Sequence, residues 1–292
     1  MAKPSEVQGL GLKTPIAKSG MALVSARLAD VNQHQQRLGA RPSQDAVHRT
    51  RVSTRRLRCA IHLFGKKALR RHQAQVKAFQ DALGHVRDIQ LQIQWLQSQP
   101  GARRTALRPI LIEQRQALLA AARELRGRVS HWRNQTAPAL AKLMLSAVRS
   151  KGRLGGARMR RRLKKKLAQT VPELEGFDEA KDALTLHRLR IALKKHRYDV
   201  ELLELAFPAY AGLALSVLAP LQSELGSVHD KDVRLELLSR FSAKASDRHR
   251  VEIEALLSEL LASRRQEVEG LSKKIGWLVS EKIPDRLRRL LD

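Results

Sequence analysis

One segment of this chain occurs twice, and no other feature of the sequence limits the possible folds as strongly. Residues 48–58 read HRTRVSTRRLR and residues 187–197 read HRLRIALKKHR, so every basic position of the first copy is basic in the second. A second pair follows in the same order, because residues 79–88 (FQDALGHVRD) and 221–230 (LQSELGSVHD) share Gln, Leu-Gly, Val and the final Asp. Two matching segments in one order, about 140 residues apart, predict two duplicated structural units.

The composition and periodicity around these repeats favour an all-α fold. Hydrophobic residues make up 43% of the 292 residues, but aromatic residues only 3%. This balance suits helical bundles better than sheet cores, which are rich in β-branched and aromatic side chains. Segments of alternating polarity separated by hairpin turns do not occur in the sequence. We therefore expect an all-α protein, with one large domain or two fused halves.

Proline and glycine residues divide the chain into a short lead-in and two helical halves. We expect a loose lead-in over residues 1–20, a first helical unit over 21–148, a basic hinge and linker over 149–177, and a second helical unit over 178–292. The expected helices of the first unit cover about 43–64, 69–99 (with or without a break at Gly84) and 103–133. Those of the second cover about 180–206, 209–227, 229–243 and 246–275, followed by a short tail from Pro284.

The net charge of the chain is +28, from 56 Lys and Arg against 28 Asp and Glu. A field of this size attracts polyanions, so the candidate partners are nucleic acid, an anionic membrane and a phosphate polymer. Cys59 is the only cysteine, which excludes an internal disulfide and fits a reducing cytoplasm. The sequence has no apolar run of the ~18 to 20 residues that cross a bilayer, and no apolar stretch typical of a secretory signal at its start. We expect a soluble intracellular protein.

Helical phasing sorts each repeated segment into a basic face and a core face. On the opposite side of the first copy lie Thr50, Ser53, Leu57, Ile61 and Phe64, and apolar residues lie on or near the far side of the second copy. The basic stripe of the first copy consists of His48, Arg51, Arg55 and Arg58, flanked by Arg49 and Arg56; that of the second consists of His187, Arg190, Lys194 and Arg197, flanked by Arg188 and Lys195.

Such a stripe is either an ordinary solvated helix face or an anion-binding surface. Solvated faces usually carry acidic residues one turn away that relieve the repulsion, yet neither eleven-residue copy contains Asp or Glu. Stacked like charges cost stability unless an anion neutralises them, so we interpret the stripes as anion-binding. Micromolar affinity needs many contacts of about 1 kcal/mol each, which favours an extended polymer over a small anion.

Two further basic groups are open to both interpretations. One is an arginine set on the helix expected over 103–133, which either lines a groove or forms a solvated face. The other is the cluster at residues 158–166, which either faces solvent or extends the anion path. The arginines of the first set that fall within one narrow arc are Arg104, Arg108, Arg115, Arg126 and Arg133.

The order and spacing of the two repeated motifs resemble the CHAD family, the conserved histidine α-helical domain. The resemblance covers roughly residues 21–291 and implies two antiparallel four-helix bundles related by pseudo-two-fold symmetry, with a basic groove or pore between them. It also implies binding of inorganic polyphosphate and association with polyphosphate granules. The twelve residues of the two stripes and their flanks match the family's signature helices, with phosphate contact as their expected role. Arg87-Asp88 and His229-Asp230 match its helix-end motif, where the Asp is expected to orient a neighbouring Arg.

The favoured interpretation is therefore a cytoplasmic, granule-associated protein that binds polyphosphate without catalysis and without a metal or cofactor. Sequence-independent binding of nucleic acid is the alternative, although single strands require aromatic stacking platforms that this chain supplies sparsely. A phosphohydrolase would need carboxylate pairs or metal-ligand spacing that we do not find. A histidine metal site at His48 and His62 or at His187 and His196 lacks local Cys or carboxylate ligands.

Overall fold

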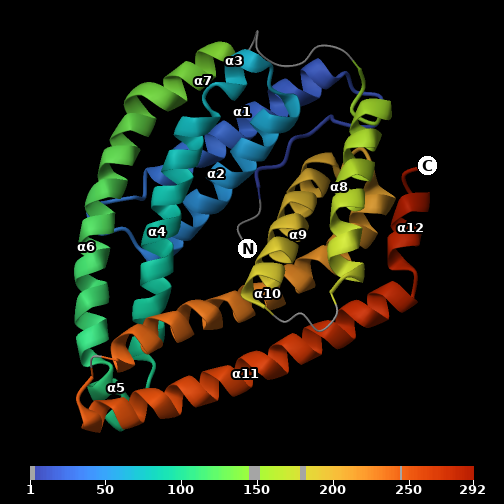
Figure 1. Ribbon diagram of the computed structural model, residues 1–292. Helices are drawn as coiled ribbons and strands as arrows, with labels where there is room; N and C mark the ends of the chain where they lie inside the picture. The colour runs from blue at the N-terminus through green and yellow to red at the C-terminus, as the bar shows by residue number, and fades with distance from the viewer. Residues whose placement is uncertain (1–3, 145–151, 178–181, 244) are drawn as a thin grey trace. The chain divides into compact units, whose positions relative to one another are not determined.

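The computed structural model describes residues 4–144, 152–177, 182–243 and 245–292. Within these ranges the chain forms helices and no β-strand, and a single antiparallel bridge joins Pro15 to Arg153. The predicted all-α class is confirmed. The helical elements (Figure 1) are α1 (Ile16–Gln35), α2 (Gln44–Phe64), α3 (Lys67–Arg70), α4 (Gln73–Gln97), α5 (Gly101–Ala106), α6 (Arg108–His131), the π-helical segment η1 (Trp132–Thr136), α7 (Ala137–Leu143), α8 (Ala157–Glu175), α9 (Ala183–Leu203), α10 (Pro208–Ser242), α11 (Asp247–Ser280) and α12 (Ile283–Arg289).

Contacts between these elements divide the chain into two compact units. The first unit comprises Met1–Gln99 and Arg108–Leu154, and the second comprises Pro100–Leu107 and Gly155–Asp292. The short helix α5 thus belongs with the C-terminal part of the chain, unlike the expected boundaries, because it packs against α11. An ion pair between Arg103 and Glu259 reinforces this contact.

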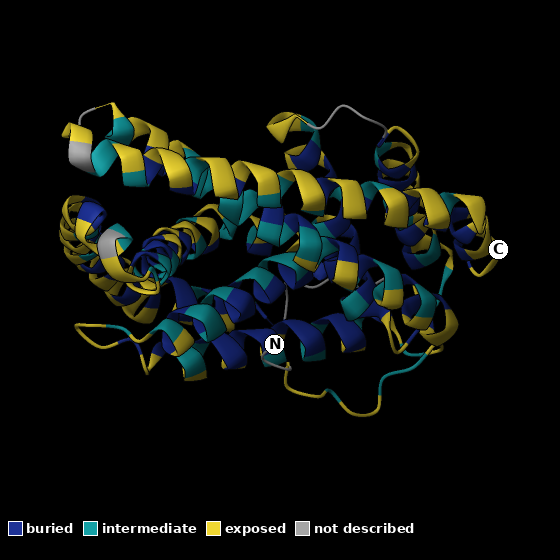
Figure 2. Ribbon diagram, turned by 90° about the horizontal axis from the view of Figure 1, so that it is seen from below, coloured by how far each residue is buried: buried dark blue, intermediate teal, exposed yellow. Residues whose placement is uncertain are grey.

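In the first unit, helices that follow one another in the sequence pack side by side: α1 with α2, α2 with α4, and α4 with α6. Helix α6 leads through η1 into α7, and α7 contacts α1. The interior is filled by aliphatic side chains and by Phe79 stacked on Trp132, with the two ring centroids 5.3 Å apart. Along each helix the buried residues gather on one side and the exposed ones on the other (Figure 2), as amphipathic helices require.

In the second unit, α8, α9, α10 and α11 pack in succession, and α12 contacts both α8 and α11. Helix α8 falls within residues 149–177, where we expected a hinge and linker. Its apolar side chains recur every turn at Met159, Leu163, Leu167 and Val171, and all four are buried. This buried stripe explains why a segment so rich in Lys and Arg folds as part of the core.

Three expected helix boundaries differ from the structure. Helix α10 runs without a break through Gly226, where we expected one helix to end and the next to begin. Buried neighbours on both sides of the glycine hold the helix to its partner, as they do at Gly84 of α4, where a break was left open. The helix expected over 103–133 is instead divided near Leu107, because Pro109 lacks the N–H that would continue the ladder and disfavours helix in the residue before it. Helix α1 begins directly after Pro15 rather than near Met21.

Candidate anion-binding site

Helix α2 presents its core face and its basic face as the sequence predicts. Ser43 begins the helix by accepting a hydrogen bond from the backbone N–H of Ala46 at 3.2 Å. The residues expected on the core face are all buried: Thr50, Ser53, Leu57, Ile61 and Phe64. The basic side chains on the other side are therefore held at fixed positions by a helix that is packed along its whole length.

The basic residues of α2 differ in how deeply they lie. His48, Arg49, Arg51, Arg55 and Arg58 are half-buried. Arg49 forms an ion pair with Asp45 one turn earlier, with 2.8 Å between Nε and the carboxylate. Arg56, which we placed at the edge of the stripe, is only 8% exposed. The accessible stripe of α2 therefore follows His48, Arg51, Arg55 and Arg58.

The second repeated motif packs directly against the first, which explains why the two occur together in the sequence. Gln80 of α4 accepts a hydrogen bond from Nη1 of Arg58 at 3.0 Å. One turn later, a β-carbon on Gly84 would lie 3.5 Å from Nε of Arg51, so the glycine sits against that side chain. Arg87, on the same face of α4, donates to Oε1 of Gln44 at 3.1 Å. Gln80, Gly84 and Arg87 thus follow the basic stripe of α2 turn by turn.

The charges around His48 confirm that this surface is a strongly positive environment. Burial lowers the pKa of His48 below its usual value, and the neighbouring Arg87 and Arg51 lower it further. Arginine guanidinium groups remain charged at any physiological pH. The first unit therefore gathers permanent positive charges from α2 and α4 on one surface, where oxygen atoms of an anion would find planar, bidentate donors.

The second unit repeats this arrangement with its own copies of the motifs. Arg197 of α9 donates to Oε1 of Gln222 of α10 at 3.4 Å, the counterpart of the Arg58–Gln80 hydrogen bond. The imidazole rings of His187 and His229 lie 6.2 Å apart between their centroids. Burial lowers the pKa of His229, and the neighbouring Arg190 lowers it as well. Each unit thus joins its basic helix to its Gln–Leu-Gly helix by an equivalent Arg–Gln hydrogen bond.

The remaining basic residues of α9 are placed less uniformly than the sequence stripe suggests. Arg190 and Lys194 are half-buried, whereas His187, Arg188 and Lys195 are exposed. Arg197 is 8% exposed and forms an ion pair with Glu201, at 2.9 Å between Nε and Oε1. The sequence window of 187–197 contains no acid, but the residue one turn beyond it partly neutralises the last arginine.

The two helix-end aspartates lie in different surroundings. Asp88 is exposed and has no hydrogen-bond or ion-pair partner among the residues described, so it orients no arginine. Asp230 is half-buried. Burial lowers the pKa of both His229 and Arg234, and the negative charge of Asp230 opposes that lowering. Among the described residues no group of three or more His, Cys, Asp or Glu side chains is placed to hold a metal ion.

The secondary arginines do not form one continuous stripe. Arg104 lies on α5, whereas Arg108 and Arg115 lie on α6, and all three are exposed. Arg126 of α6 and Arg133 of η1 instead border a pocket within the first unit. The helix break near Leu107 is the reason that Arg104 separates from the others.

In the basic cluster of α8, only part of the charge faces solvent. Arg162 contacts the buried Asp199 through two hydrogen bonds of 2.7 Å and 3.3 Å, which fixes α8 to α9. Lys166 is half-buried, and burial lowers its pKa. Arg158, Arg161 and Lys165 are exposed and remain available to a polyanion.

Sequence reasoning did not identify Gln80 and Gln222 as part of the site. Both glutamines were visible as shared letters of the second motif, but the pattern did not indicate that this motif faces the basic helix. The signal that could have found them is their spacing, since Gln80, Gly84 and Arg87 recur at helical intervals and lie on one face.

Comparisons with known proteins agree with this architecture. The family model described as the CHAD domain matches residues 22–239. The crystal structure of the CHAD domain from the plant Ricinus communis is similar with a TM-score of 0.73 at 18% identity, and the match covers 94% of this chain and 96% of that one. PptA from Streptomyces chartreusis is similar with a TM-score of 0.65 at 14% identity, covering 91% and 100% of the two chains. No curated protein sequence matches the chain.

Proposed function

This chain belongs to the CHAD domain family, and from that premise we propose that it binds inorganic polyphosphate through the basic faces of α2 and α9 without transforming it. The observation that carries the proposal is the same assembly in both units, in which a basic helix is held by a Gln–Leu-Gly helix. Two equivalent cationic surfaces in one chain suit a ligand that repeats the same anionic group along its length.

The low aromatic content of the chain favours polyphosphate over nucleic acid. Proteins that bind single strands without sequence preference stack bases on aromatic side chains. Neither basic stripe contains an aromatic residue other than histidine, and the large rings of Phe64, Phe79, Trp132 and Tyr210 are fully buried. Polyphosphate has no bases, so a surface of arginine and lysine alone meets its requirements.

A binding role without catalysis and a location on polyphosphate granules follow from the same proposal. The arginines that dominate the first stripe are suited to holding phosphate oxygens rather than to proton transfer, because they do not deprotonate in proteins. None of the described helices is both long and apolar enough to span a membrane. A cytoplasmic protein with net charge +28 would be drawn to a dense polyanion such as a granule.

A competition titration distinguishes polyphosphate from nucleic acid. Labelled long-chain polyphosphate, bound to the protein at physiological salt, is displaced by unlabelled polyphosphate, single-stranded DNA or double-stranded DNA at matched phosphate concentration. We expect polyphosphate to compete at least tenfold better than either DNA. Equal competition by DNA would favour the nucleic-acid alternative. Salt dependence alone does not separate the two, because counterion release accompanies both.

Charge reversal tests which surface holds the ligand. We expect Arg51→Glu with Arg55→Glu to weaken polyphosphate binding by roughly 30-fold or more, since two charge-assisted contacts become repulsive. The matched control is Arg161→Glu with Lys165→Glu on the exposed face of α8, which changes the net charge equally. Arg162 is unsuitable as a control because its contact with buried Asp199 holds the fold. Equal losses in the two double variants would contradict the assignment to α2.

A further inference from the structure

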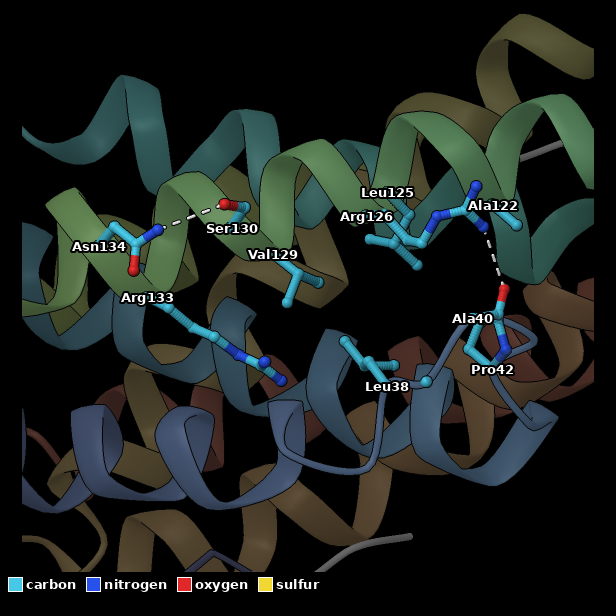
Figure 3. A pocket seen from close by; sticks show the side chains of 11 residues that line it. Leu38, Ala40, Pro42, Ala122, Leu125, Arg126, Val129, Ser130, Arg133 and Asn134 are labelled. Atoms are coloured by element: carbon cyan, nitrogen blue, oxygen red, sulfur yellow. Dashed lines mark hydrogen bonds between the residues drawn. The ribbon is translucent and has the colours of Figure 1, made fainter.

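The first unit contains a pocket that the proposed polyphosphate surface does not use. It lies between α6 with η1 and the loop that joins α1 to α2 (Figure 3). Its volume is about 410 Å³. This volume falls within the range of about 300 to 1,000 Å³ that is typical of small-molecule sites. Eleven residues line the pocket, which is far fewer than a standard protein–protein interface requires.

The middle of the pocket is apolar. Leu38 reaches into it from the loop, and Leu125 and Val129 face it from α6 (Figure 3). All three side chains are mostly buried, with Leu125 only 2% exposed, so the apolar surface forms part of the wall of the unit. Filling this space with an alkyl group would remove further apolar area from water, which favours binding.

An arginine stands near each end of the apolar stretch (Figure 3). Arg126 donates from Nη1 to the carbonyl oxygen of Ala40 at 3.2 Å, which leaves its Nη2 and Nε without a partner among the described residues. Arg133 donates from Nε and Nη2 to Gln35 at the C-terminal end of α1, and its Nη1 has no such partner. Both guanidinium groups are thus fixed in place and retain donors for a ligand.

No acidic residue lines the pocket to neutralise these two arginines. The nearest glutamate along α6, Glu124, pairs with Arg128 instead, at 3.8 Å. The pocket therefore combines an apolar interior with a net positive border. Polyphosphate would satisfy the arginines but not the apolar wall, and a neutral apolar molecule would leave the arginine donors unused.

We propose that this pocket binds a small amphiphilic anion, in which a carboxylate or phosphate head meets Arg126 or Arg133 and a short alkyl tail covers Leu38 and Val129. The site is separate from the polyphosphate surface and does not depend on it, because the basic face of α2 carries neither Arg126 nor Arg133.

Methyl NMR of the 292-residue chain tests the proposal. Octyl phosphate and octanoate, both below their micelle concentrations, are titrated into protein with labelled Leu and Val methyl groups. We expect saturable shifts at Leu38, Leu125 and Val129, with the stronger of the two probes indicating which head group the arginines prefer. Inorganic phosphate and 1-octanol are the matched controls, and each should bind at least tenfold more weakly because it offers only half of the required chemistry.

Two variants separate the roles of charge and space. Arg126→Gln keeps a donor for Ala40 but removes the charge, and it should weaken octyl phosphate binding about tenfold. Ala122→Phe fills the pocket from α6 and should abolish the shifts. Ala122→Phe should still bind polyphosphate as the parent does, because Ala122 lies outside both basic stripes. The pocket and the polyphosphate surface are thereby tested independently.

The proposal is overturned by any of three results: no shift at the pocket methyl groups, equal binding of 1-octanol and octyl phosphate, or unchanged binding in Ala122→Phe. Equal binding of 1-octanol would mean that the apolar wall acts alone and that Arg126 and Arg133 serve only to hold the loop and the end of α1.

Discussion

His196 is a fully buried titratable residue that takes no part in the basic stripe of α9. Its Nε2 lies 2.6 Å from the hydroxyl oxygen of Tyr210, and its Nδ1 lies 3.1 Å from the hydroxyl oxygen of Thr170. The three side chains join α8, α9 and α10 within the second unit. Burial, with a smaller contribution from Lys166, lowers the pKa of His196 to about 4, so the neutral imidazole is the form that fits.

This network makes the second unit sensitive to acid. The pKa of His196 in the folded state lies below its ordinary value of 6.5, so the unfolded state binds more protons between pH 6.5 and about 4. The free energy of unfolding therefore falls as the pH falls through this window, by about 3 kcal/mol in total. Above pH 6.5 His196 is neutral in both the folded and the unfolded state, so none of this stability is lost. Urea unfolding at pH 7.5, 5.5 and 4.5 measures this loss.

The matched control for this measurement is His196→Gln, which retains donor and acceptor groups but does not titrate in this range. The variant should be less stable at pH 7.5 and should lose less stability on acidification than the parent. Parallel pH profiles for the two proteins would show that other groups cause the acid sensitivity.

The sequence predicts which residues lie on the basic face of each helix, but it does not predict how deeply each side chain is buried. The helical period gives the angle of a residue around its axis, which places Arg51 and Leu57 correctly on opposite sides of α2. It does not reveal which neighbouring helix covers the flank, and so it did not indicate that Arg56 is buried. Burial depends on partners far away in the sequence.

At the scale of helices, α4 approaches α2 closely at Gly84. A β-carbon on Gly84 would make an ordinary contact with Nε of Arg51 at 3.5 Å, but any atom beyond it would displace the guanidinium. The equivalent glycine of the second unit, Gly226, has nothing within 4 Å of the same position. The two copies of Leu-Gly therefore differ in how tightly they meet their basic helix.

We expect Gly84→Val to weaken polyphosphate binding about tenfold, because it moves one charge-assisted contact out of place. Gly84→Ala should keep the parent affinity, and within a helix it should add up to about 1 kcal/mol to the free energy of unfolding. Isothermal titration with polyphosphate and urea unfolding measure the two effects. Gly226→Val is the matched control and should bind normally; a loss equal to that of Gly84→Val would refute the role of the close approach.

The existence of the long helices could be predicted from their period, whereas their continuity depends on packing. Gly226 and the nearby Pro220 are local signals for ending a helix, yet α10 continues through both. Buried Leu218, Leu221 and Leu225 lie alongside and hold the helix against α9, which outweighs the local preference. In α8, conversely, the many Lys and Arg residues in the sequence led us to expect a hinge, and the apolar residue at every turn was not recognised as a buried stripe.

For the whole molecule, the positive charge is unevenly compensated between the two units. In the second unit, ion pairs join α10 to α11, with Lys231 contacting Glu267 at 2.5 Å and Arg264 contacting Asp232 at 2.5 Å. Burial lowers the pKa of Arg234, and the negative charges of Asp230 and Glu267 partly oppose that lowering. In the first unit, the positive charges of Arg51 on α2 and Arg87 on α4 both lower the pKa of His48. The pseudo-two-fold relation and the groove between the bundles stay predictions.

This imbalance predicts that the first unit binds phosphate more tightly than the second. Arginine offers two parallel donors to a phosphate where lysine offers a point charge, and the position of Arg55 is occupied by Lys194 in the second stripe. We expect Arg51→Gln with Arg55→Gln to weaken binding of tripolyphosphate strongly. Arg190→Gln with Lys194→Gln should leave it nearly unchanged. Isothermal titration measures both.

Long-chain polyphosphate should respond differently from tripolyphosphate. A stripe of eleven helical residues extends about 15 Å, which is longer than a chain of three phosphates. A long chain that engages both units gains from the effective concentration of the second binding event, and then each pair of substitutions weakens binding. If Arg190→Gln with Lys194→Gln leaves the affinity for long chains unchanged as well, only the first unit binds, and the duplicated motif of the second unit serves its fold alone.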